Sequence, residues 1–146
     1  MKPLTSIGAA VALLLVLSSC TATSPAQPTL YHALGERDGI ASITDSFLGQ
    51  LATNQSVLPL FLNTDIERFR EQFINHLCAT ADGPCRYDGD AMRETHRGMR
   101  ITTAQFNSVV ENLIDALEAN AVSTATQNAL LQRLARHYGD IVEQRY

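Results

Sequence analysis

The 146-residue sequence lacks the features that several classes of protein require. No apolar run reaches the ~20 residues that a helix needs to span a membrane. Basic residues number 11 against 15 acidic ones, which makes nucleic acid a poor partner. The sequence also shows no internal repeat and no convincing strand-like alternation of apolar and polar residues. Its length leaves room for one domain with a single core.

The N-terminal segment has the pattern of an export signal. Lys2 supplies the positive end, and an apolar run over residues 8–17 follows it. A transmembrane helix is the alternative, but this run is too short to span the hydrocarbon core. We therefore expect residues 1–19 to be a signal peptide.

The four residues that end at Cys20, Leu-Ser-Ser-Cys, resemble the bacterial lipobox. That resemblance implies that Cys20 is lipidated and anchors an exported protein to a membrane. Thr21 in the next position implies the outer membrane, with the protein facing the periplasm. Residues 20–29 show no periodicity and are expected to form a lipidated flexible tether. Ordinary cleavage near Ser18 or Ala22 is the alternative.

The cysteines and the charge of the mature chain follow from this processing. Removal of residues 1–19 takes away one basic residue and leaves 10 basic and 15 acidic residues, a net charge of −5. If Cys20 carries lipid, Cys78 and Cys85 remain in a compartment that permits disulfides. We predict that they pair and close a small loop, with a contribution of ~2–4 kcal/mol to stability. Two unrelated reduced thiols are the alternative.

The segments after the tether have the helical period, so residues 30–146 are predicted to form one all-α domain. Thr102 with Gln105, and Thr64 with Glu67, have the spacing of capping boxes that begin helices. A generic four-helix bundle would explain the apolar stripes equally well. The stripes are Ile40, Ile43, Phe47 and Leu51; Ile66, Phe69, Phe73, Ile74 and Leu77; Phe106, Val109, Val110, Leu113, Ile114 and Leu117; and Leu130, Leu131, Leu134, Tyr138, Ile141 and Val142.

A short segment between the second and third stripes is the most informative part of the chain. We expect it to form a very short helix with His96 at its centre and Met92 on the same face, between Gly89 and Gly98. A simple bundle has no need for such a helix. A haem iron needs a neutral imidazole on one side and apolar cover on both faces, and His96 can supply the imidazole.

Apolar residues that could line a haem occur on both sides of His96 in the sequence. Arg93 and Arg97 flank it and could pair with the haem propionates, although a solvated helix face explains at least one of them equally well. The candidates nearest to His96 are Tyr87, Met92, Met99, Ile101, Phe106 and Val109, and those from the opposite helices are Leu48, Phe61, Phe69, Phe73 and Leu77.

The order and spacing of these motifs resemble those of the group I truncated haemoglobins over nearly the whole mature domain. The resemblance implies a two-over-two helical sandwich around non-covalent haem b, with His96 as the proximal ligand and Phe61 packed on the haem. The absence of Cys-x-x-Cys-His excludes covalent c-type attachment. The shared motifs are Leu30-Tyr31-x-x-Leu34-Gly35, Gly39-Ile40, Phe47, Phe61-x-x-Thr64-Asp65, Gly83-Pro84, Tyr87-x-Gly89, Met92-x-x-x-His96 and Ile101-Thr102 before Phe106.

The distal side departs from the pattern of that family. Many members place a tyrosine directly after the phenylalanine that Phe47 matches, often with a glutamine on the facing helix, and both hydrogen-bond dioxygen. Here the matching residues are Leu48 and Phe73, which leaves Gln72 as the nearest polar candidate. Oxygen should therefore be held loosely, because a missing hydrogen bond costs of order 1 kcal/mol or more. His76 is expected either to approach the iron or a propionate, or to cap the edge of the pocket.

The sequence is compatible with three functions. The first is reversible binding of a diatomic gas, O2, NO or CO, at a haem iron held by His96. The second is redox chemistry, as a peroxidase-like protein or as a nitric oxide dioxygenase with a partner reductase. The third is a helical scaffold lipoprotein without haem.

Overall fold

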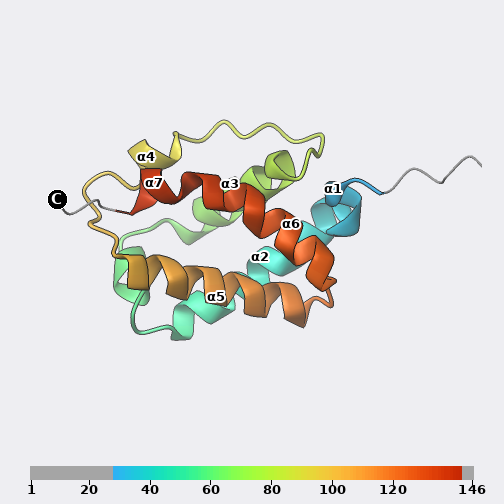
Figure 1. The fold of residues 1–146 in the computed structure, drawn as a ribbon. Coiled ribbons are helices and arrows are strands. Elements are labelled where there is room, and N and C mark those ends of the chain that lie inside the picture. Colours follow the sequence, from blue (N-terminus) through green and yellow to red (C-terminus); the bar gives the residue numbers. More distant parts are fainter. Residues whose placement is uncertain (1–27, 143–146) are drawn as a thin grey trace, which may run out of the picture.

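A computed structural model describes residues 28–142, and every regular element in that range is a helix (Figure 1). The predicted all-α class is therefore confirmed. Residues 1–27 and 143–146 lie outside the described residues, and with them the signal peptide, Cys20 and most of the tether. The helices are α1 (Leu30–Ala33), α2 (Glu36–Thr53), η1 (Leu58–Phe61), α3 (Ile66–Thr80), α4 (Met92–Thr95), α5 (Thr103–Ala119), α6 (Thr124–Leu134), η2 (Ala135–His137) and α7 (Tyr138–Ile141).

The long helices surround a single core. α2 packs against both α3 and α5, and α6 packs against α3 (Figure 1). The single turn of α4 lies beside α7 at one end of the molecule, and α1 lies at the other end. Of the helices that the structure describes, none is long and apolar enough to cross a membrane. The most deeply buried side chains include Ile40, Ile43, Phe47, Val57, Ile74, Leu77, Cys78, Leu117 and Leu130.

Capping explains where two of the helices begin. At α5 the capping box is present, since Thr102 Oγ1 accepts from the Gln105 N–H and Gln105 Oε1 accepts from the Thr102 N–H. The box predicted with Thr64 at α3 was wrong. Asp65 is the N-cap there, and its carboxylate accepts from the Arg68 N–H at 3.1 Å. A carboxylate one residue later also complements the positive end of the helix dipole.

The C-terminal apolar stripe is broken into three elements where the sequence predicted one long helix. α6 ends at Leu134, one turn of 3₁₀ helix follows as η2, and α7 continues to Ile141. Because residues three apart fall on one side in both helix types, the apolar period does not distinguish them. The break places His137 at the end of η2 and start of α7.

A disulfide joins the end of α3 to the loop that leads to α4. Cys78 and Cys85 are bonded, with their Cα atoms 5.7 Å apart, so the predicted pairing is confirmed. Arg133 of α6 holds the same corner, because its guanidinium donates to the Thr80 carbonyl oxygen and to the Asp82 carboxylate. The loop over residues 81–91 is thus fixed at its start.

Candidate functional site

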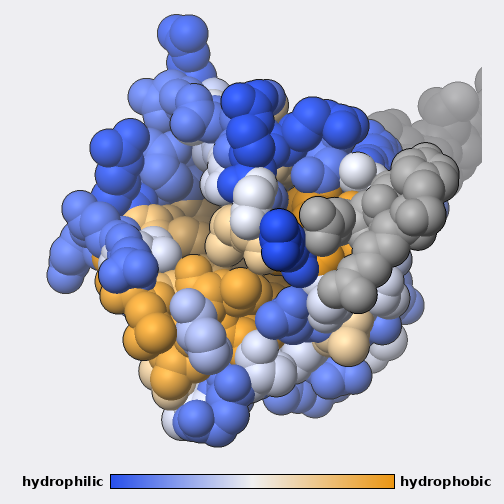
Figure 2. Space-filling view, turned by 90° about the vertical axis from the view of Figure 1, so that its left-hand side faces the viewer, coloured by the Kyte–Doolittle hydropathy of each residue, from blue (hydrophilic) through white to orange (hydrophobic). Residues whose placement is uncertain are grey.

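An apolar cavity of about 330 Å³ lies between α3 on one side and α4, α5 and α7 on the other. Figure 2 looks onto this end of the molecule and shows apolar side chains gathered there among hydrophilic ones. The cavity is lined by Phe47, Leu60, Phe61, Thr64, Phe69, Gln72, Phe73, His76, Tyr87, Met92, Thr95, His96, Met99, Ile101, Phe106, Val109, Val110, Leu113, Leu134, His137 and Ile141.

A second hollow, of about 450 Å³, lies at the opposite corner between α1, α2 and the start of α6. It is larger and more open, but its lining holds no histidine, cysteine or carboxylate. Ser42, Asn120, Ser123 and Thr126 are its polar side chains. The chemistry-bearing groups therefore belong to the smaller apolar cavity.

Aromatic rings form the α3 wall of the cavity. Phe73 stacks on Phe47 of α2, with ring centroids 4.9 Å apart, and on Phe69, with centroids 5.6 Å apart. Phe61 meets Phe69 edge to face at 5.5 Å. These contacts give a flat, rigid apolar surface, since offset and edge-to-face ring pairs are favourable arrangements.

His96 occupies the C-cap of α4, where the sequence predicted the middle of a short helix. Its Nδ1 lies 2.7 Å from the Met92 carbonyl oxygen. A carbonyl oxygen only accepts, so Nδ1 carries the proton and Nε2 keeps its lone pair. A half-buried imidazole oriented in this way at the cavity wall is ready to bind a metal through Nε2.

Two further histidines line the cavity. The rings of His76 and His137 have centroids 5.5 Å apart, and the His76 ring also meets Tyr87 at 5.1 Å. Burial, with smaller contributions from the charges of His137 and His96, lowers the pKa of His76 from 6.5 to about 4. His76 is therefore neutral at physiological pH.

Tyr87 fixes the loop before α4. Its hydroxyl donates to the Asp90 carbonyl oxygen at 2.9 Å, and burial raises the pKa of this hydroxyl. A Cβ atom at Gly89 would lie only 2.5 Å from the end of the Tyr87 ring. The Tyr-x-Gly motif is thus explained by packing, because only glycine lets the ring lie over the loop.

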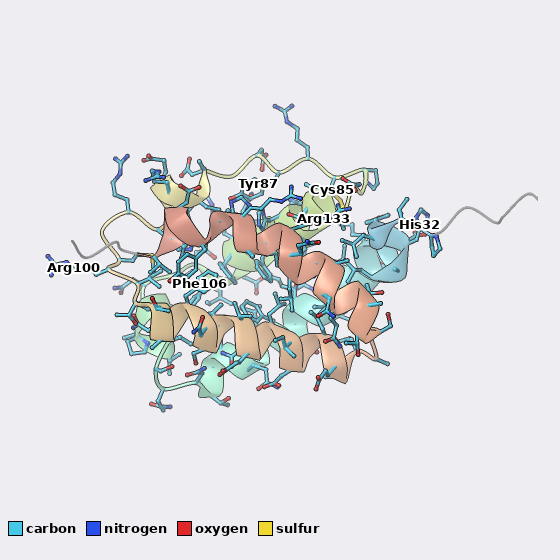
Figure 3. All side chains as sticks on the ribbon, in the orientation of Figure 1. His32, Cys85, Tyr87, Arg100, Phe106 and Arg133 are labelled. Carbon is cyan, nitrogen blue, oxygen red and sulfur yellow. A yellow bond between two sulfur atoms is a disulfide. The ribbon has the colours of Figure 1, made fainter. Side chains whose placement is uncertain are left out.

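Phe106 completes the cavity on the side of α5. Figure 3 shows the ring reaching from the start of α5 toward α7, where it meets Tyr138 edge-on with centroids 4.9 Å apart. Arg100 precedes it and points away from the molecule in the same view. Met99 and Ile101, the two sequence neighbours of Arg100, line the cavity.

Three residues expected at the site lie elsewhere. Leu77 is fully buried in the core with Ile74 and Cys78. Each four-residue step drifts by about 40° around α3, so Leu77 lies about 80° from Phe69, toward the core. Leu48 packs against the core beside Phe47 and does not line the cavity, because successive residues turn by about 100° around a helix.

The third of these residues is Arg93, whose guanidinium forms an ion pair with Asp140 outside the cavity lining. Arg97, its neighbour on the other side of His96, pairs with Glu94. Both side chains are largely exposed, so the interpretation as a solvated helix face describes them in this structure.

The sequence pattern did not identify several of the residues that line the cavity. His137 was not identified from the sequence, although it lies three residues after Leu134 and four before Ile141, which share the cavity. That spacing was the available signal. The other missed residues are Leu60, Thr64, Thr95, Val110, Leu113, Leu134 and Ile141.

Comparison with known proteins agrees with this geometry. A family model described as Bacterial-like globin matches residues 29–142. The group 1 truncated hemoglobin of Nostoc sp. (strain MUN 8820) is 28% identical over 114 residues, which cover 78% of this chain and 97% of that relative. The group 1 truncated hemoglobin of Tetrahymena pyriformis is 29% identical over 100 residues, 68% of this chain and 83% of the relative.

Solved structures give the same result. The Fe(III) form of truncated hemoglobin from Tetrahymena pyriformis matches with a TM-score of 0.77 and 26% identity, covering 80% of this chain and 100% of that one. The 2/2 hemoglobin from Synechococcus sp. PCC 7002 shares the fold, with a TM-score of 0.75 at 22% identity, over 80% of this chain and 100% of that one. The chain therefore belongs to the bacterial-like globin family, and its fold is the two-over-two helical fold of truncated haemoglobins.

Proposed function

We propose that the protein holds haem b in the apolar cavity and binds a diatomic gas reversibly, with His96 as the axial ligand of the iron. The orientation of His96 carries this proposal. Its Nδ1 is committed to the Met92 carbonyl oxygen, which leaves Nε2 for a metal. The haem would supply an iron with an open position for the gas, and the globin family supports this class of function.

The remaining residues of the cavity fit a flat apolar group. The stacked rings of Phe47, Phe69 and Phe73 form one wall, while Phe106 and Met99 line the cavity from the other side. Apolar cover on both sides excludes water from the iron site. Arg93 could serve a propionate only by exchanging its present partner, Asp140.

Two hydroxyl groups of the described cavity are committed to carbonyl oxygens and are not free to donate to a gas. The Tyr87 hydroxyl donates to the Asp90 carbonyl oxygen, and the Thr95 hydroxyl donates to the Ala91 carbonyl oxygen at 3.2 Å. Oxygen depends on such a donor more than carbon monoxide or nitric oxide do. We therefore expect loose oxygen binding, and we rank gas binding above conversion of nitric oxide to nitrate. Stopped-flow mixing of the oxygenated protein with nitric oxide separates the two, since rapid nitrate formation would favour the dioxygenase.

Export and lipid anchoring at Cys20 form part of the proposal. The disulfide between Cys78 and Cys85 supports it, because structural disulfides persist mainly in oxidising compartments. The protein would then work at a membrane surface facing the periplasm, with gas as its ligand. Mass spectrometry of the membrane fraction tests this directly: diacylglyceryl modification of Cys20 is expected, and an unmodified Cys20 in a soluble fraction would contradict it.

Titration of the haem-free protein with hemin tests the function. A Soret band that saturates at one hemin per chain is expected, together with a carbonyl spectrum after reduction in carbon monoxide. A protein that takes up no hemin under conditions in which it is folded would instead be the helical scaffold.

A further inference from the structure

Gln72 is a polar side chain on the aromatic wall of the cavity. It lies on the same face of α3 as Phe69, Phe73 and His76. Its Oε1 is buried and has no hydrogen-bond partner in the described part of the chain. A buried acceptor without a partner is uncommon in native structures, and such a group often has a functional reason.

The other end of the same amide group is held from outside the cavity. Gln72 Nε2 donates to Oδ1 of Asp88, an exposed residue of the loop before α4, at 3.3 Å. An ionised carboxylate only accepts hydrogen bonds, so the NH2 group must face it. The reverse orientation would place the amide oxygen against the carboxylate. Asp88 therefore selects which end of the Gln72 amide is buried.

The position of Asp88 is itself well fixed. It lies between Tyr87, whose hydroxyl is bonded to the Asp90 carbonyl oxygen, and Gly89, over which the Tyr87 ring packs. The disulfide at Cys85 ties the same loop to α3, the helix that carries Gln72. The loop is thus joined to α3 at two points, by the disulfide at Cys85 and by the hydrogen bond between Asp88 and Gln72.

We propose that Asp88 is a positioning residue that turns the oxygen of the Gln72 amide toward the gas site, so that the site favours ligands that carry a proton over dioxygen. This inference rests on the haem and gas-binding function proposed above. A water or hydrogen peroxide molecule at the iron can donate to Oε1. Dioxygen, which accepts hydrogen bonds through its partly negative outer atom, gains nothing from this acceptor and receives no hydrogen bond from Gln72.

The central experiment compares Asp88→Asn with the unchanged protein. An asparagine can face either end of the amide, so a bound gas that accepts hydrogen bonds selects the orientation with NH2 inward. We expect oxygen dissociation to slow about fivefold, the factor that one ordinary neutral hydrogen bond gives. The infrared C–O stretch of the carbonyl form should shift to lower wavenumber, because a donor near the ligand strengthens back-donation from iron.

Two controls make the result specific. Asp90→Asn removes the same charge two residues along the loop and should leave both readouts unchanged. In a Gln72→Leu background, Asp88→Asn should have no effect, because the amide through which Asp88 acts is gone. An unchanged dissociation rate in Asp88→Asn, or an equal change with and without Gln72, would overturn the proposal.

A measurement without haem separates this inference from the function on which it rests. The side-chain amide resonances of Gln72 in haem-free protein should shift in Asp88→Asn and not in Asp90→Asn. Absence of a Soret band that depends on His96 would refute the haem function, whatever these resonances do. If the Soret band is present but the Gln72 side-chain amide resonances are the same in Asp88→Asn and in the unchanged protein, only the positioning role is refuted.

Discussion

Phe47 of α2 and Phe73 of α3 stack with their ring centroids 4.9 Å apart and their planes at 20°. The pair joins two helices that are adjacent in the core, and both rings line the cavity. The resemblance to the group I truncated haemoglobins matches Phe73 to a position where a glutamine is expected, so an aromatic contact stands where that pattern would place a hydrogen-bond donor. The ring pair therefore belongs both to the core packing and to the wall of the proposed gas site.

Replacement of Phe73 by glutamine should restore a donor on this wall. We expect Phe73→Gln to slow oxygen dissociation by roughly 5- to 10-fold, as a hydrogen bond of about 1 kcal/mol or slightly more would, with little change for carbon monoxide. Flash photolysis and stopped-flow kinetics measure both. Phe73→Leu controls for loss of the ring, and equal oxygen kinetics in the two variants would refute the explanation.

Gly89 and Gly49 should respond oppositely to alanine. A Cβ atom at Gly89 would lie 2.5 Å from the Tyr87 ring, whereas at Gly49, inside α2, it would meet nothing within 4 Å. Gly89→Ala should destabilise by about 1–3 kcal/mol through overpacking. Gly49→Ala should stabilise by about 0.5–1 kcal/mol, because alanine loses less backbone entropy on folding. Urea denaturation monitors both, and the account of the Tyr-x-Gly motif fails if Gly89→Ala is neutral.

The disulfide should contribute measurable stability. The Cys78–Cys85 bond closes a loop with a sequence separation of 7. Chain-entropy estimates for such a small loop give about 2–3 kcal/mol. Cys78→Ala with Cys85→Ala should lower the free energy of unfolding by about this amount, and the wild type with its disulfide reduced is the matched comparison. If oxidised and reduced wild type unfold at the same urea concentration, the bond is not a stabilising element.

His76 should make the haem-free protein sensitive to acid. Its folded-state pKa is lowered to about 4 from 6.5, so below pH 6.5 the unfolded chain binds a proton that the folded chain does not. Stability should therefore fall as pH drops from 6.5 toward 4, by about 2 kcal/mol at pH 4.5. His76→Phe should flatten the profile, and His32→Gln, at an exposed histidine, should not. A profile unchanged by His76→Phe would contradict the assignment.

The helices and the place of His96 beside Met92 were predictable from local patterns. Phe69, Phe73 and the α5 stripe follow the 3.6-residue period, and the Thr102 capping box fixed the start of α5. Met92 and His96 were placed together by their four-residue spacing, and the structure shows them hydrogen-bonded. Local propensity and short spacings carry this part of the information.

Other features depend on tertiary packing that the sequence pattern does not encode. Leu77 belongs to the apolar stripe of α3 but faces the core. The sequence pattern could not reveal this, because an apolar period does not distinguish a cavity wall from a core. The break of the last stripe at η2, which ends at His137, is another such feature, because residues three apart fall on one side in both helix types. The hydrogen bond between Gln72 and Asp88 joins residues 16 positions apart across a loop, and no periodic pattern in the sequence predicts it.

The central claim is that His96 Nε2 binds the haem iron. It is tested most directly by the ferric, ferrous and carbonyl absorption spectra of the wild type beside His96→Gly, with and without added imidazole. We predict that the wild type has a five-coordinate ferrous haem, that His96→Gly loses this spectrum, and that imidazole restores it. A variant whose ferrous and carbonyl spectra match those of the wild type without imidazole would show that another residue holds the iron.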